Sequence, residues 1–148
     1  MNDIAGLSFS DIAIGKSKFT TQKILESEVD QFGKLSGDMN PLHMDEKFAE
    51  STPFKKRVVH GMFVAALISK THTDLTGPGF VYVGQELNFK SPVHIGDTIK
   101  ISLTVKEKKE EKGILVLETI VTNQDDKIVL NGKSALMELK RIQERKED

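Results

Sequence analysis

The side chains most capable of chemistry gather in one short stretch of this sequence. Residues 36–45 hold Asp38 and His43, five positions apart, and His60 stands seventeen positions after His43. A carboxylate and an imidazole brought together can hold one water molecule between them and exchange protons with it. The stretch is therefore a candidate site for acid and base catalysis.

The same residues also allow a purely structural interpretation. Asp and Asn side chains cap turns and proline fixes their backbone, so Asp38-Met39-Asn40-Pro41 taken alone favours a simple turn as much as a catalytic site. His60, beside an apolar segment, fits a core or capping histidine, and Asp45 fits the N-cap of a short helix. The sequence outside this stretch must decide between the two interpretations.

The composition excludes several other kinds of chemistry. With 148 residues, 38% hydrophobic and 29% charged, the chain fits one soluble domain with a single core. It has no cysteine, which excludes disulfides, thiolate nucleophiles and Cys-ligated metals. Its formal charge of -1 argues against a nucleic-acid partner. Met1 to Ser10 lacks the pattern of a secretory signal and no apolar run is long enough to span a membrane, so we expect a cytoplasmic protein without a membrane partner.

Three helical segments are expected around the candidate site. Apolar residues recur every three positions between Glu26 and Gly37, with Ser27 as the expected N-cap and Gly37 as the stop. A short helix is expected from Asp45 to Glu50. Val58 to Ile68 is apolar nearly all the way round, which predicts a central helix buried on every side.

The rest of the chain is expected to form strands. Four are predicted: Phe80 to Ser91, Thr98 to Lys106, Ile114 to Thr122 and Lys127 to Lys140. Ile99 to Lys106 alternates between apolar and polar residues, which is typical of a half-buried antiparallel strand. Lys106 to Lys112 and Asn123 to Asp126 look like hairpin connections, Pro92 to Asp97 links the first two strands, and Arg141 to Asp148 fits a solvated tail. Strands after one long helix indicate an α+β fold with an antiparallel sheet around that helix, and the exposed edge of such a sheet predicts a homodimer.

The wider sequence around Asp38 resembles a known signature. Ser36-Gly37-Asp38-Met39-Asn40-Pro41-Leu42-His43-Met44-Asp45, followed by His60-Gly61-Met62, resembles the motif of the MaoC-like dehydratase family, which includes the (R)-specific enoyl-CoA hydratases. A second segment, Gly84 to Val93 with Gly96-Asp97, is also typical of that family. The similarity covers most of the chain, from about Phe19 to Met137.

This resemblance implies a fold and a set of roles. It implies one hot-dog domain over residues 1–148, with a core from about residue 10 to residue 140, in which Val59 to Thr73 is the central helix. Asp38 and His43 match the catalytic pair of the family, and Gly61 matches the glycine whose backbone N–H binds the thioester oxygen. The implied reaction is the reversible addition of water to a trans-2-enoyl-CoA to give the (R)-3-hydroxyacyl-CoA, without a cofactor beyond the coenzyme A of the substrate.

Five further residues are candidates for binding the substrate. Lys55, Lys56 and Arg57 form a basic run that could meet the phosphates of coenzyme A or of a carrier protein's phosphopantetheine arm, although such runs more often only solvate a surface. Asn40 could orient the loop or the reacting water, and Ser69 on the central helix could border the acyl pocket. No residue is expected to bind a metal.

Four alternatives to an enoyl-CoA hydratase are open at this point. A 3-hydroxyacyl carrier-protein dehydratase would use the same groups in the reverse direction. A hot-dog acyl-CoA thioesterase would commonly carry an acidic residue on the central helix, where only Asp74 stands at the end. A metal-dependent hydrolase would use Asp38, His43, Asp45 and His60, but a histidine at a helix start is expected to be poorly placed to share a metal with a loop. A non-catalytic binding module would be expected to lack the Asp and His pair.

Overall fold

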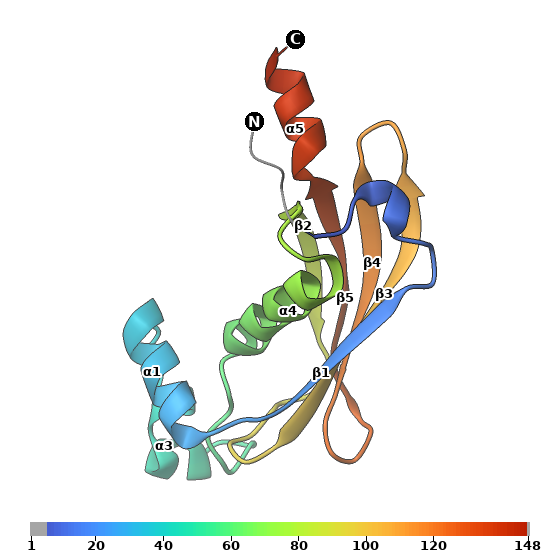
Figure 1. The fold of residues 1–148 in the computed structure, drawn as a ribbon. Helices are drawn as coiled ribbons and strands as arrows, with labels where there is room; N and C mark the ends of the chain where they lie inside the picture. The colour runs from blue at the N-terminus through green and yellow to red at the C-terminus, as the bar shows by residue number, and fades with distance from the viewer. Residues whose placement is uncertain (1–5, 148) are drawn as a thin grey trace.

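The computed structural model describes residues 6–147 (Figure 1). The helices are η1 (Phe9–Asp11), α1 (Glu26–Ser36), α2 (Pro41–Met44), α3 (Glu46–Glu50), α4 (Gly61–Thr76) and α5 (Leu139–Glu147). The strands are β1 (Ser17–Lys23), β2 (Phe80–Phe89), β3 (Thr98–Lys109), β4 (Ile114–Thr122) and β5 (Ile128–Glu138). Residues 1–5, part of the segment interpreted above as lacking a secretory signal, and Asp148, the end of the expected tail, lie outside the described residues. None of the described helices is long and apolar enough to cross a membrane.

The five strands form one antiparallel sheet in the order β1-β3-β4-β5-β2. Helix α4 lies against one face of this sheet, where it contacts β1, β2 and β3 (Figure 1). The inward residues of β3, Ile99, Ile101, Leu103 and Val105, are fully buried, so the alternation predicted for this strand is confirmed. The predicted α+β arrangement of one antiparallel sheet and one long helix is confirmed as well.

Strand β1 is an element that the sequence pattern did not reveal. It pairs with β3 from Ser17 opposite Thr104 to Lys23 opposite Thr98. It lies at the edge of the sheet, and none of its residues is buried; its one large apolar residue, Phe19, is 60% exposed. An edge strand that buries so little carries no alternation of apolar and polar residues, which is why the pattern gives no signal there.

One predicted connection, the end of the fourth strand and the expected tail need correction. Strand β3 continues to Lys109, so the predicted connection from Lys106 to Lys112 is mostly strand. Pro92 to Asp97 joins β2 to β3, as predicted, although β2 pairs with β5. The predicted fourth strand ends at Glu138, and the expected tail is part of a helix, α5. The side chain of Arg141 attaches this helix to the turn between β3 and β4, because its Nη1 donates to the carbonyl oxygens of residues 110 and 111 (2.9 and 3.2 Å).

Helix α4 is buried on one side only in the single chain, and the prediction that it is buried on every side is wrong. Val64 and Ile68 face the sheet and are buried, as are the polar residues Thr71 and His72 further along. On the opposite side the helix exposes a stripe formed by Met62, Ala66, Ser69 and Thr73, which we call the free stripe of α4. The apolar sequence of this helix therefore exceeds what one chain can bury.

Helix α1 packs outside the sheet, beside α2 and α3 (Figure 1). Its N-cap is Leu25 and not the predicted Ser27, because the carboxylate of Glu28 accepts a hydrogen bond from the Leu25 N–H (2.9 Å) and begins the helix earlier. Val29 anchors the helix in the core, where its side chain is fully buried. These short helices place residues 36–60 at the N-terminal end of α4.

Candidate active site

The loop after α1 brings the reactive residues of the motif together. Gly37 ends α1 in the left-handed region (φ 80°), as predicted. Asp38 follows, and its Oδ1 accepts a hydrogen bond from the N–H of Asn40 (3.3 Å). Asn40 caps α2 because its own Oδ1 accepts from the N–H of Leu42 (3.1 Å). Helix α2 then carries His43 back toward Asp38.

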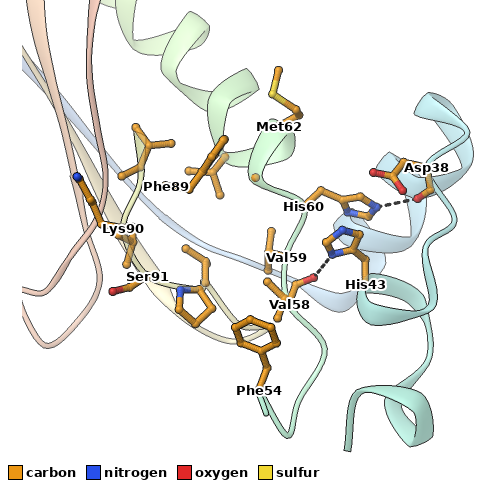
Figure 2. Close-up of a pocket in the computed structure, with 16 residues that line it drawn as sticks. Asp38, His43, Phe54, Val58, Val59, His60, Met62, Phe89, Lys90 and Ser91 are labelled. Carbon is orange, nitrogen blue, oxygen red and sulfur yellow. Dashed lines mark hydrogen bonds between the residues drawn. The ribbon is translucent and has the colours of Figure 1, made fainter. Parts of the chain in front are cut away.

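The imidazole of His43 is held in one tautomer. Its Nδ1 lies 2.6 Å from the carbonyl oxygen of Val58 (Figure 2). A carbonyl oxygen only accepts hydrogen bonds, so Nδ1 must carry a proton. In the neutral ring the lone pair is then on Nε2, which leaves this atom able to accept a proton from a water molecule.

Asp38, His43 and His60 converge beside the first residue of α4 (Figure 2). One nitrogen or oxygen atom from each side chain lies within 4.8 Å of the others. A hydrogen bond to water spans about 2.8 Å, so a carboxylate and an imidazole this close can both contact the same water molecule. The arrangement can therefore polarise a single water from two sides.

His60 is a buried support beneath this pair. Its Nε2 donates a hydrogen bond to the backbone oxygen of Asp38 (2.9 Å), and its ring centroid lies 4.2 Å from that of His43. The ring centroid of Phe32 lies 4.9 Å from that of the same imidazole, and the two rings are steeply inclined to each other. The Nδ1 atom of His60 has no hydrogen-bond partner among the described residues. These contacts agree with the structural role expected for His60 from the sequence.

The same cluster corrects one expectation about metal ligands. His60, although it is at the start of a helix, does come within reach of the loop residues Asp38 and His43. Asp45 is not part of the cluster, because it caps α3 and accepts a hydrogen bond from the N–H of Phe48 (3.2 Å), as expected. Two histidines and one carboxylate are a donor set that suits Zn²⁺. That the protein needs no metal remains a prediction.

A cavity of about 480 Å³ opens beside these three residues. This size suits a small organic ligand. Most of the lining is aliphatic or aromatic; Asp38, His43 and His60 lie together on one side, and Lys90 and Ser91 lie on the opposite side (Figure 2). The lining residues are Asp38, His43, Phe54, Val58, Val59, His60, Gly61, Met62, Val64, Phe89, Lys90, Ser91, Pro92, Val93, Val129 and Leu130.

Gly61 lines the cavity at the N-terminal end of α4. The first hydrogen bonds of this helix are donated by Phe63 and Val64 to the carbonyl of His60, so the N–H of Gly61 precedes them and has no partner within the helix. A Cβ atom at this position would lie 2.6 Å from the ring of Phe89. Glycine therefore leaves room here, at the positive end of a helix dipole, for an oxygen atom to approach the backbone.

The five predicted substrate-binding residues lie outside the lining of this cavity. Asn40 caps α2, and Ser69 is exposed on the free stripe of α4. Lys55 and Lys56 are exposed on the loop after α3, next to Phe54, which does line the cavity. Arg57 is the clearest departure from expectation, because its side chain is 6% exposed and its guanidinium is paired with two carboxylates.

Several lining residues escaped the sequence analysis. Phe89 and Lys90 are both exposed and line one wall of the cavity, and Val129 and Leu130 also contribute to its lining. The only signal for the first two was their place in the segment from Gly84 to Val93, which resembles the family. Nothing in the local pattern of β5 distinguishes its wall residues from ordinary core residues.

A second buried polar group lies further along α4. The Nε2 of His72 is 2.6 Å from the hydroxyl of Ser134, and its ring centroid lies 4.7 Å from that of Tyr82. Burial lowers the pKa of His72 to about 4, because the charged imidazolium would lose its hydration. Burial also raises the pKa of Tyr82 to about 12. His72 is therefore a neutral core residue at physiological pH.

Together, the fold and the site define an enzyme of the hot-dog type. An Asp and His pair lies at the N-terminal end of α4, the helix that packs against the sheet. The family model described as "MaoC like domain" matches residues 12–126. The chain belongs to this family, and it is an enzyme of the hydratase and dehydratase class.

Three known proteins show how close the relationship is. The chain is 42% identical to an (R)-specific enoyl-CoA hydratase of Rhodospirillum rubrum over 130 residues, 87% of this chain and 90% of that protein. It is 39% identical to a 3-hydroxybutyryl-CoA dehydratase of Methylorubrum extorquens over 129 residues, 86% of this chain and 82% of that protein. The solved structure of the unliganded R-hydratase PhaJ1 of Pseudomonas aeruginosa superposes with a TM-score of 0.84 at 37% identity, over 91% of this chain and 87% of that one.

Proposed function

We propose that this enzyme adds water to a trans-2-enoyl-CoA to give the (R)-3-hydroxyacyl-CoA, and catalyses the reverse dehydration. The observation that carries the proposal is the convergence of Asp38 and His43, within 4.8 Å, on one side of a largely apolar cavity. An acyl chain suits the apolar walls, and a water molecule suits the place where the carboxylate and the imidazole meet. Relatives named for this reaction are similar over most of the chain.

In the proposed mechanism, Asp38 and His43 share the reacting water. One of the pair takes a proton from the water as its oxygen bonds to C3, and the C2–C3 double bond becomes an enolate. A proton is then delivered to C2 from the same pair, so the water is added completely and the pair returns to its starting state. Because both transfers start from one water on one face, the addition is syn.

The enolate oxygen that forms between the two proton transfers needs stabilisation. The free N–H of Gly61 is the proposed donor, because it lies at the N-terminus of α4 and lines the cavity. Removing such a donor in other enzymes costs on the order of 10² to 10³-fold in rate. Because a backbone N–H cannot be removed by substitution, glycine matters here for the space that it leaves.

We also propose that the enzyme is a homodimer, located in the cytoplasm. Two neighbouring surfaces support the dimer: the free stripe of α4, and strand β2, which pairs with β5 on one side only and exposes Val83 and Phe89. Ser69 lies on the free stripe, so its predicted place beside the acyl group depends on this dimer. A monomeric mass in analytical ultracentrifugation would contradict the proposal.

A thioesterase on the same fold is the main alternative of another class. The acidic residue that it would use on the helix is Asp74, which pairs with Lys70 (2.7 Å). Asp74 is thirteen residues beyond Gly61 on α4, which is about 20 Å along the helix axis. An acid at that distance cannot act on a carbonyl at the N-terminal end, so the geometry favours hydration over hydrolysis.

The test is the loss of the enoyl-thioester absorbance when the protein meets crotonyl-CoA, with chiral analysis of the product. We expect the (R)-3-hydroxy product from the wild type, and losses of roughly 10² to 10⁴-fold in Asp38→Asn and His43→Ala. Asp125→Asn, in the exposed turn before β5, is the matched control and should keep full activity. Release of free thiol without hydration would support the thioesterase instead.

The choice of carrier needs a separate comparison. Assays with the same acyl group on coenzyme A and on an acyl carrier protein distinguish the proposed hydratase from a carrier-protein dehydratase. A much higher kcat/KM on the carrier protein would overturn the coenzyme A assignment. Full activity after chelator treatment is expected, and a loss that Zn²⁺ restores would assign a metal to the cluster of Asp38, His43 and His60.

A further inference from the structure

We propose that Arg57 is a positioning residue for the imidazole of His43, and that it does not bind the substrate. The proposal rests on the hydratase function above for its kinetic test. Arg57 closes the short basic run before α4, where a role in binding phosphate groups is the natural expectation. Its contacts point the guanidinium away from the cavity and toward α1 and α2.

All three nitrogen atoms of the Arg57 side chain are engaged inside the protein. Nε donates to the backbone oxygen of His43 (2.6 Å), Nη1 to Glu26 (3.1 Å) and Nη2 to Asp30 (2.6 Å). The residue is 5% exposed. These contacts use three of the five N–H donors of the side chain, and the residue is buried, so turning the guanidinium toward a phosphate in the cavity would break all three contacts.

Arg57 and its neighbour Val58 hold His43 at both ends. The guanidinium binds the backbone carbonyl of His43, while the carbonyl of Val58 accepts from the ring Nδ1 (2.6 Å). The Val58 N–H also donates to the carbonyl of Leu42 (3.1 Å), the residue before the histidine. Arg57 and Val58 therefore fix both the backbone and the ring of His43. Together they set the position of its Nε2 atom.

The segment that carries Arg57 is itself tied down from the other side. The carbonyl of Arg57 accepts from His94 Nδ1 (3.0 Å), and Val58 forms an isolated β-bridge with His94. The His94 N–H donates to the carboxylate of Asp97 (2.9 Å). Arg57 therefore links two segments: its guanidinium binds helix α1, and its backbone is bound to the loop before β3. His43 lies between these segments.

Only arginine can make this set of contacts. Its planar guanidinium presents donors in three directions from a rigid fork, whereas a lysine ammonium is a single point charge. Lysine at position 57 could pair with one carboxylate but could not also hold the His43 carbonyl. Displacement of a catalytic group by about 1 Å can cost on the order of 10²-fold in rate, so the loss of the fork should show in catalysis.

The kinetic test compares Arg57→Gln and Arg57→Lys with the wild type on crotonyl-CoA and on crotonyl-pantetheine, which lacks the nucleotide phosphates. We expect kcat to fall roughly 10- to 100-fold in both variants and equally on both substrates, with KM little changed. Lys47→Gln, an exposed lysine on α3, is the control for a lost positive charge. A rise in KM on crotonyl-CoA alone, with kcat unchanged, would overturn the proposal and assign Arg57 to phosphate binding.

A spectroscopic readout separates this proposal from the proposed function. In the wild type, ¹⁵N NMR of the imidazoles should report His43 as the Nδ1–H tautomer, and Arg57→Gln should shift or mix that signal even if no enoyl thioester is ever turned over. An unchanged His43 signal in Arg57→Gln would refute the positioning role. If Arg57→Gln fails to fold, Asp30→Asn is tested instead, because it keeps the arginine and weakens its short 2.6 Å contact. We expect this variant to have a lower kcat than the wild type. Full kcat in Asp30→Asn would count against the proposal.

Discussion

Acidification should destabilise this protein through His72, a residue that takes no part in the proposed chemistry. Its imidazole is 3% exposed, and burial lowers its pKa from 6.5 to about 4. Between these two pH values the unfolded chain binds a proton at His72 that the folded chain does not. The free energy of unfolding is therefore unaffected by His72 above pH 6.5 and falls as the pH drops below that value. At about 1.4 kcal/mol for each unit between the two pKa values, the loss is about 2 kcal/mol by pH 5 and about 3 kcal/mol by pH 4.

Urea unfolding of the wild type and of His72→Gln at pH 7.5, 6.0 and 5.0 measures this loss. Glutamine does not titrate and can still hydrogen-bond the hydroxyl of Ser134, so the two proteins share every other pH-dependent group. We expect the wild type to lose about 2 kcal/mol more than the variant between pH 7.5 and 5.0. Parallel pH profiles for the two proteins would show that His72 binds its proton as easily in the folded state as in the unfolded chain, and would refute the reasoning.

Three further substitutions test the site and the core. Gly61→Ala places a Cβ 2.6 Å from the ring of Phe89; the exposed ring can swing aside, so the melting temperature should change little while kcat/KM on crotonyl-CoA falls by at least about 10-fold. Asn40→Ala removes the cap of α2 and should lower the free energy of unfolding, measured in urea, by about 1 kcal/mol. It should also lower kcat, and an unchanged kcat would show that α2 holds His43 in place without its cap. Leu103→Ala empties a fully buried position of β3 and should cost about 2 to 5 kcal/mol, with KM unchanged in whatever protein remains folded.

The parts of the fold that the sequence predicts are those that bury a regular face. The inward residues of β3 repeat every second position because the strand is covered on one side only, and the central helix is apolar enough to locate within two or three residues of its start. β1 escapes prediction because it is polar apart from Phe19, which is exposed, so the strand shows no alternation of apolar and polar residues. Helix α5 escapes because its attachment depends on Arg141 reaching the turn between β3 and β4, a contact between distant segments that no local pattern records.

The candidate site divides in the same way. Asp38, His43 and Gly61 are marked by the resemblance of their segments to the motif of the family, because the types and spacing of the residues around Asp38 fit a simple turn equally well. Arg57 lies only fourteen positions after His43, yet its partners Glu26 and Asp30 belong to another helix, and a run of three basic residues gives no sign that the third turns inward. The strand residues that line the cavity have an apolar character that is indistinguishable from that of the core.

The origin of the cavity lining has a consequence for how this enzyme can diversify. The groups proposed to handle water and the thioester oxygen all belong to residues 38–61, whereas a large part of the apolar lining comes from residues 89–93 and from Val129 and Leu130 on β5. Substitutions in these later segments can therefore lengthen, shorten or reshape the space for an acyl chain without displacing Asp38 or His43. Part of the space for the acyl chain is therefore encoded apart from the residues proposed for catalysis, so it can vary between related proteins while those residues are kept.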